Sequence, residues 1–382
     1  MKRIIFLLVF CVLLTGIILG QDEIVPDPRR GNLTIGASLQ MWRMEPHYNT
    51  IDETAAPISL LLPLGDRFNL SVSHTAAVVK WEKDMSLSGL SDTWVQGTYT
   101  FFDDKIFLNL GVALPTGKTR IDSVQLILSQ QISKNIFKYQ LPAFGQGLSV
   151  KGGFGFAYPV QEGLVLGFGA QYIYKGAYHP LEYTYGSAVG INKIWDEEFD
   201  AGDEFSVHAG MDIKIAENMK LMIDGMYSHF GKDLWAGSEI FSAGNRVTIS
   251  SGLFYRFNRD TQYLWAQLRY RQYGRVSREQ DLVLVREEKN SNGYQIEFNA
   301  DCKIFPYYRG GLSVLADVRF NGKDEMYQYS ANCYGGGLGA QYEIIYGTKI
   351  LFHVKYLFGY INRGASRRIE GLDTALYFSF DL

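Results

Sequence analysis

Residues 294–304 read YQIEFNADCKI, and apolar side chains alternate with polar ones along the whole stretch. Successive side chains of a β-strand point to opposite faces, so this period of two predicts a strand with one apolar and one polar face. Residues 310–321 and 349–361 repeat the pattern. Soluble β-sandwiches alternate in the same way, so the pattern alone predicts strands and not the manner in which they close.

The lengths of strands and connections favour a barrel. The strands read from the sequence have roughly 10 to 13 residues, against about 5 or 6 in globular sheets and about 9 to 11 for a tilted membrane strand. Short turns such as residues 65–67 alternate with longer polar segments near 44–54, 81–90, 115–145, 176–203, 232–244 and 275–291. Short turns at one end and long loops at the other are typical of transmembrane barrels.

We therefore predict an all-β fold, a transmembrane antiparallel up-and-down β-barrel of about sixteen strands. The predicted strands lie near residues 32–43, 55–63, 67–80, 91–102, 105–113, 146–158, 164–175, 204–215, 220–230, 246–257, 262–274, 292–304, 310–321, 331–343, 349–361 and 370–382. Fourteen strands is the alternative, if residues before 66 form a plug or a linker. An even count places both termini at the periplasmic end.

The two ends of the chain predict export and membrane assembly. Residues 1–20 combine Lys2 and Arg3 with a short apolar run and read as a signal peptide, followed by a periplasmic segment at 21–31 and the barrel at 32–382. Apolar residues alternate to the C-terminus in the last strand, as in outer-membrane proteins that the barrel-assembly machinery recognises. The expected location is the bacterial outer membrane, with its lipid as a partner.

Composition and motifs exclude several other functions. The chain has 37 basic and 40 acidic residues, and this balance predicts no nucleic-acid partner. The six histidines lack metal-ligand spacing, so we predict neither a metal nor another cofactor. Ser73-His74 and Ser228-His229 place each serine and histidine on opposite strand faces, and we do not expect an enzyme. Cys302 is expected on the outward face of its strand and Cys333 on the inward face of another, so we predict no disulfide between them.

Residues 121–139 are an exception within the long loops, because their apolar residues repeat with a helical period. A loop that folds onto the barrel mouth could trap an apolar substrate, and packing of the loop against its neighbours is an equal alternative. The residues that fall close to one helical face are Val124, Ile127, Leu128, Ile132 and Ile136.

The inward parity of the strands carries many charges. These side chains can satisfy one another across the lumen, and they can also set permeation and selectivity. Four cations are taken as candidates for the substrate path, Arg269, Arg271, Arg319 and Lys355. The other predicted inward charges are Lys151, Lys175, His208, Asp212, Lys214, Asp224, Arg256, Glu297, Asp301, Lys303, Asp317, Glu343 and His353.

Ser88-Gly89-Leu90-Ser91-Asp92-Thr93, residues 99–104 and Leu110-Gly111-Val112-Ala113-Leu114-Pro115-Thr116-Gly117-Lys118 form a recognisable passage. It resembles the outer-membrane transporters of the FadL/TodX type and the related barrels of phenol-degradation (meta-cleavage) pathways. Residues 178–181 and 201–204 add to the likeness, which covers about residues 55–260. The resemblance implies passive uptake of hydrophobic compounds, which leave sideways through the wall or pass the lumen. The sequence has no N-terminal Asn-Pro-Ala plug motif, so the gating element of that type is not evident.

The expected function is a passive outer-membrane channel for a small-molecule substrate, with hydrophobic compounds as one class. Two alternatives stay open. The barrel could serve a secretion or surface-attachment machine as a structural or assembly component, or it could be a lipid-modifying barrel enzyme.

Overall fold

The computed structural model describes most of the chain after the N-terminal segment. It describes residues 32–381, apart from 46–49, 82–84, 103–104, 123–124, 126–127, 129–144, 181–182, 187–191, 196, 259–261, 281–282, 287–292, 308, 325–328, 346 and 364. The predicted signal peptide and periplasmic segment lie outside this range. No helix within the described residues is long and apolar enough to cross a membrane.

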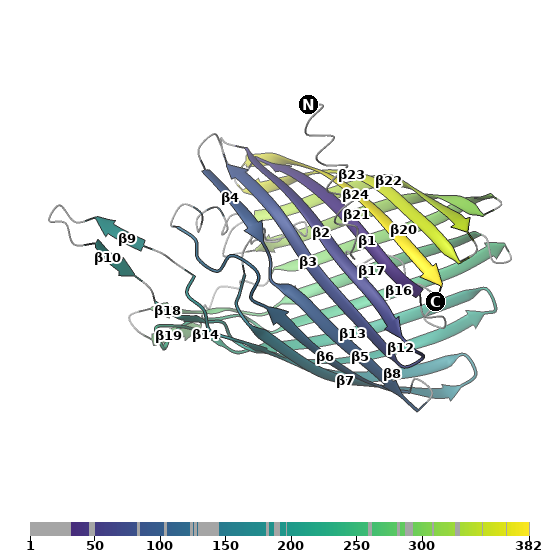
Figure 1. Cartoon of the computed structure of the whole chain (residues 1–382), viewed down its shortest axis with the longest axis horizontal. Helices are drawn as coiled ribbons and strands as arrows, with labels where there is room; N and C mark the ends of the chain where they lie inside the picture. The colour runs from purple at the N-terminus through teal and green to yellow at the C-terminus, as the bar shows by residue number, and fades with distance from the viewer. Residues whose placement is uncertain are drawn as a thin grey trace.

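The strands close into one antiparallel cylinder, as predicted (Figure 1). Its wall consists of β1 (Asn32–Met44), β2 (Ile51–Leu64), β3 (Phe68–Trp81), β4 (Met85–Leu90) with β5 (Thr93–Phe101), β6 (Ile106–Leu114), β7 (Ser149–Gln161), β8 (Leu164–Lys175), β12 (Glu204–Ala216), β13 (Met219–Phe230), β16 (Arg246–Asn258), β17 (Gln262–Tyr273), β20 (Tyr294–Tyr307), β21 (Gly310–Asp324), β22 (Tyr329–Ile345), β23 (Thr348–Arg363) and β24 (Ala365–Asp381). β24 pairs with β1 from Asp381 and Asn32 onward, so the barrel closes with the first and last strand ends at the same end.

Sixteen is the strand count of the wall, because β4 and β5 occupy one place in it. β3 pairs with β5 over residues 68–73 and with β4 over residues 76–81. Residues 81–90 were predicted as a loop, and that prediction was wrong: residues 85–90 extend the barrel wall as β4. The sequence obscures this strand because its polarity is reversed: the apolar Leu87 is buried inside, and the polar Ser86 and Ser88 are exposed.

Side chains follow the predicted alternation. On β23, Phe352, Tyr356 and Phe358 are exposed on the outer face, whereas His353 and Lys355 are buried inside. The outer face carries large apolar side chains around the barrel; Leu110, Phe168 and Leu338, from three separate strands, are each at least 60% exposed. Such a continuous apolar surface is unusual for a protein surrounded by water and is suited to a lipid environment.

The long connections gather at one barrel end, termed the loop end, and the short turns at the other, termed the turn end. Gly65 opens a turn between β2 and β3 with φ +76°, a conformation that glycine adopts without strain. At the loop end, the connections build a second, five-stranded sheet from β11 (Phe199–Asp200), β14 (Lys232–Trp235), β15 (Ser238–Ser242), β18 (Ser277–Gln280) and β19 (Val283–Arg286). β9 (Tyr183–Gly186) and β10 (Asn192–Trp195) form a hairpin that projects beyond it (Figure 1).

The external sheet is fastened to the barrel near Gly202. The Gly202 N–H donates to the Asp233 carboxyl group at 2.7 Å. Nearby, Tyr178 pairs with Phe199 through a backbone bridge and an edge-to-face ring contact, with the ring centroids 5.6 Å apart. Burial raises the pKa of the Asp233 carboxyl, although the Gly202 N–H and Lys175 act in the opposite direction.

This raised pKa predicts a pH dependence of the external sheet. A carboxyl group with a raised pKa holds its proton longer in the folded state, so its contribution to stability is present at low pH and is lost as pH rises through that pKa. We expect protection of the Gly202 amide from hydrogen exchange, corrected for intrinsic rates, to fall as pH increases through that range. Asp233→Asn should remove this dependence, and protection that rises with pH would contradict the assignment.

Candidate functional site

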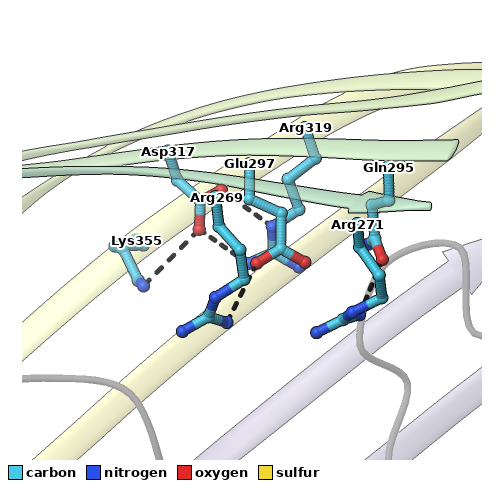
Figure 2. Close-up of polar contacts among 7 residues, drawn as sticks. All are labelled: Arg269, Arg271, Gln295, Glu297, Asp317, Arg319 and Lys355. Atoms are coloured by element: carbon cyan, nitrogen blue, oxygen red, sulfur yellow. Dashed lines mark hydrogen bonds and ion pairs between the residues drawn. The ribbon is translucent and has the colours of Figure 1, made fainter. Parts of the chain in front are cut away.

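A belt of charged side chains lines one side of the lumen (Figure 2). Its centre is Asp317 on β21, which is fully buried. Arg319 Nε and Nη2 donate to the two Asp317 carboxylate oxygens at 2.8 and 2.6 Å, in a bidentate arrangement. Lys355 Nζ on β23 lies 3.7 Å from Asp317 Oδ2 and 3.5 Å from Asp373 Oδ2 on β24. One carboxylate therefore holds two buried cations, and a second carboxylate shares one of them.

The belt continues onto β20 and β17. Arg269 Nη1 is 3.4 Å from Glu297 Oε2, whose side chain is 1% exposed. Arg271 Nη1 donates to the Gln295 amide oxygen at 2.8 Å, while its Nε has no acceptor. The four cations predicted for the substrate path thus lie on one continuous stretch of wall, and acids that were predicted as inward hold three of them. The sequence did not predict Asp373 on β24 as a partner of this belt.

An apolar cluster borders the charged belt on the side of the loop end. On β23, Lys355 is followed by the buried inward residues Leu357 and Ile361, and on β22 Cys333 lies opposite Arg319 in the strand register. Trp42 on β1 connects the two regions, because the Arg319 guanidinium carbon lies 5.9 Å from its ring centroid. The cluster residues are Trp42, Met44, Ile51, Val79, Leu87, Ile121, Leu128, Ala331, Cys333, Leu357, Ile361 and Ile369.

The loop after β6 contributes two residues to this apolar cluster. Ile121 is 1% exposed and Leu128 is fully buried and has a helical backbone, as its spacing predicted. The other cluster members are inward side chains of β1–β4 and β22–β24, so this part of the loop lies inside the barrel mouth. Burial of each such side chain stabilises the arrangement by about 1.5–3 kcal/mol. Val124, Ile127, Ile132 and Ile136 lie outside the described residues.

The wall has an interruption where β4 meets β5. β6 pairs with β5 up to Thr93 and Leu114, and beyond that point β4 has ladder pairing with β3 alone among the described strands. The free side of β4 receives isolated contacts from the loop instead: Lys118 N donates to Leu90 O, and Gln125 Nε2 donates to Ser86 O, each at 3.3 Å. A sheet edge therefore opens in the wall next to the apolar cluster.

Asp92 holds this interruption together. Its Oδ1 accepts a hydrogen bond from Gly117 N at 3.0 Å, and its Oδ2 accepts one from Gln146 N at 2.6 Å. Thr93 Oγ1 adds a contact of 2.8 Å to Thr116 Oγ1. The segments 88–93 and 115–118, which carry the resemblance to known barrels in the sequence, therefore meet in space at one point of the wall.

Two glycines allow that approach. A Cβ atom on Gly145 would lie 2.6 Å from Asp92 Oδ1 and 3.0 Å from the Gly117 backbone. We therefore expect Gly145→Ala to displace residues 115–118 and to cost about 1–3 kcal/mol locally. A cysteine introduced at Thr116 should react faster with a membrane-impermeant maleimide in the Gly145→Ala background. Gly225→Ala is the control, since the nearest atom to its added Cβ is 3.9 Å away. Equal labelling rates in the Gly145→Ala and Gly225→Ala backgrounds would contradict the expectation.

The two Ser–His pairs have the predicted opposite orientations. Ser73 and Ser228 are on inward positions, whereas His74 Nδ1 lies 3.0 Å from Thr93 Oγ1 and His229 Nδ1 lies 2.9 Å from Asn245 Oδ1. Neither histidine contacts its neighbouring serine in these pairs. Within the described part of the chain, no three His, Cys, Asp or Glu side chains are grouped in a way that could hold a metal ion.

Sequence reasoning missed a further inward residue, Glu53. Residues 44–54 were predicted as an external loop, but β2 begins at Ile51, four residues earlier than predicted. Glu53 and the cluster residue Ile51 therefore lie inside the barrel, 2% exposed each. Alternation from Ile51 through Ala55 and Ile58 was the available signal, and the acidic pair at 52–53 obscured it.

No family model matches the sequence, and no curated protein matches it. Among solved structures, an outer membrane channel from Pseudomonas putida F1 is 10% identical, with a TM-score of 0.40 over 95% of this chain and 100% of that chain. The Pseudomonas putida toluene transporter TodX is 10% identical, with a TM-score of 0.41 over 94% and 90%. A Pseudomonas aeruginosa FadL homologue is 11% identical, with a TM-score of 0.40 over 93% and 90%. The chain is therefore similar to outer-membrane channel barrels, among them the FadL/TodX type that residues 88–118 resemble.

Proposed function

We propose that this protein is a passive outer-membrane channel that admits small molecules, hydrophobic compounds among them. The observation that carries the proposal is the apolar cluster inside the barrel mouth. Twelve buried apolar side chains in one cluster exclude water from this part of the lumen. A closure without water favours the entry of apolar solutes over polar ones. Displacement of Ile121 and Leu128 would expose these side chains to a solute of similar character.

The outer face supports the membrane location. Tyr, Phe and Leu side chains cover the strands on the outside, and among the described strands β4 alone leaves one side without a paired strand in the wall. A closed barrel satisfies its backbone hydrogen bonds within the wall, which a bilayer requires. Phe378 and Phe380 lie on the outward face of β24, and we propose that the barrel-assembly machinery recognises this strand.

Two exits from the apolar cluster are available to a solute. One leads along the lumen past the charged belt, where Asp317 and Arg319 form a buried bidentate ion pair on one side. The other leads sideways past Asp92, where no described strand pairs with the side of β4 that faces away from β3. We propose the sideways exit for apolar solutes, because lipid is their preferred destination and the charged belt disfavours them.

Purified protein in liposomes tests the proposal. We expect it to speed entry of a bulky aromatic ester, trapped on arrival by an internal esterase, several times over empty liposomes. Tethering residues 115–118 to the wall, by a disulfide between Thr116→Cys and Ser91→Cys, should slow that entry, and reduction should restore it. Entry no faster than in empty liposomes would refute the channel. Entry unaffected by the tether would refute only the sideways exit.

A further inference from the structure

The inner face of β1 and β2 carries a carboxyl group without a partner. Glu53 is 2% exposed, and neither of its carboxyl oxygens has a hydrogen-bond partner among the described residues. It occupies an inward position of β2, opposite Trp42 on β1 and Val79 on β3 in the strand register. Ile51 and Ala55 precede and follow it on the same face. All four neighbours are buried apolar side chains.

This position is unfavourable for the stability of the barrel. A buried polar group without a hydrogen bond destabilises the folded state, and an apolar side chain of similar size would avoid that cost. The alternation of β2 places the side chain of residue 53 inside the barrel, but it does not require that side chain to be charged. Positions that break a folding rule in this way are expected at functional sites. An ionisable residue buried among apolar side chains at membrane depth is by default a candidate for a functional site.

Further unpartnered oxygens continue from Glu53 toward the turn end. Gln40 Oε1, Ser38 Oγ and Ser59 Oγ are buried on the same two strands and have no hydrogen-bond partner. Each serine hydroxyl can donate as well as accept a hydrogen bond, but the Glu53 and Gln40 oxygens are acceptors, and they lack donors in this described part of the wall. Arg319 does not supply them, because its guanidinium is held by Asp317 and faces the Trp42 ring.

The missing partner has a definite chemistry. An ammonium group carries three N–H donors, and its positive charge balances the negative charge of a carboxylate in an apolar pocket. The Trp42 ring beside Glu53 can add a cation–π contact, and the apolar cluster can receive the rest of the molecule. An alcohol offers one donor without charge, and a carboxylate would be repelled.

We propose that Glu53 binds the ammonium group of a small apolar amine inside the barrel mouth, with the amine's apolar body against the loop-end cluster. The inference rests on the proposed channel function and deepens it by naming a substrate class. Glu53 is then the polar recognition residue of an otherwise apolar closure.

Calorimetric titration of the detergent-solubilised whole protein tests this with three probes of one aromatic body: 2-phenylethylamine, 2-phenylethanol and 3-phenylpropionate. We expect the amine to bind at least about tenfold more tightly than the alcohol, as a charge-assisted hydrogen bond predicts, and the carboxylate most weakly. Glu53→Gln should reduce the amine-to-alcohol ratio to about one and keep alcohol binding. Glu370→Gln, which removes an outward carboxylate near the same barrel end, should leave the ratio unchanged.

A second variant separates recognition from folding. Glu53→Met should raise the urea midpoint for unfolding while it abolishes the amine preference, whereas a structural role for Glu53 predicts a lower midpoint. Equal binding of amine and alcohol by the native protein, binding of neither, or an amine preference that survives in Glu53→Gln would each overturn the inference. Liposome entry of the aromatic ester is measured in parallel, so equal binding of amine and alcohol by the native protein, together with intact ester flux, refutes this site alone and leaves the channel standing.

Discussion

Asp317→Ala is expected to lower the free energy of unfolding by about 3–5 kcal/mol, because it leaves two buried cations without their shared carboxylate. Arg319 would lose a bidentate partner at 2.6–2.8 Å, and Lys355 would lose one of its two carboxylates and keep Asp373. Arg319 is 7% and Lys355 6% exposed, so water cannot easily replace the lost partner. Urea unfolding in lipid, followed by tryptophan fluorescence and by heat-modifiable migration on a gel, measures the change.

The matched control is Asp212→Ala, which removes another lumen carboxylate. Asp212 pairs with Lys220 at 2.5 Å, but the two side chains are 40% and 46% exposed, so its loss should cost about 0–1 kcal/mol. The double variant Asp317→Leu with Arg319→Met should recover part of the stability, since it removes both charges together. Equal effects of Asp317→Ala and Asp212→Ala would show that the belt is solvated rather than buried.

Leu128→Asp is expected to open the barrel mouth. The substitution places a carboxylate among the apolar cluster, where an unpartnered polar group costs at least about 2 kcal/mol. A closed arrangement weakened by that amount is populated roughly thirtyfold less relative to the open one. We therefore expect the conductance of protein-containing planar bilayers to rise by up to that factor.

Leu128→Met controls for the change of residue, because it retains an apolar side chain of similar volume and should leave the conductance close to that of the native protein. The folded barrel must also persist in both variants, which heat-modifiable migration verifies. A conductance for Leu128→Asp that equals the native value would mean that the loop after β6 does not close the mouth.

The wall of this barrel was predictable because membrane strands impose a strict period of two. Residues 294–304 and 349–361 assign each side chain to a face, and the inward charges that follow from that parity include Arg269, Arg319 and Lys355. The charged belt could therefore be foreseen as a set of inward residues, and Leu128 could be assigned to an apolar helical face. Strand order followed from the up-and-down connectivity alone.

Contacts between inward side chains were harder to predict, because alternation gives the face on which a side chain lies but not its distance from other side chains. Nothing in the spacing indicates that Arg319 faces Trp42 or that Asp373 shares Lys355. β4 and the beginning of β2 were read as loops because short polar runs dominate them, at Ser86-Leu87-Ser88 and Asp52-Glu53. Both belong to the mouth of the barrel, at the loop end of the wall. Asp92 could be located only through the resemblance of its segment to known barrels.

Solute entry into liposomes with no energy source is the most direct test of a passive channel closed by an apolar cluster. The bulky aromatic ester, without an internal esterase, should enter until its inner and outer concentrations are equal, faster through Leu128→Asp than through the native protein, and at the background rate through heat-denatured protein. Accumulation above the outer concentration, or entry at the background rate through both folded proteins, would contradict the account.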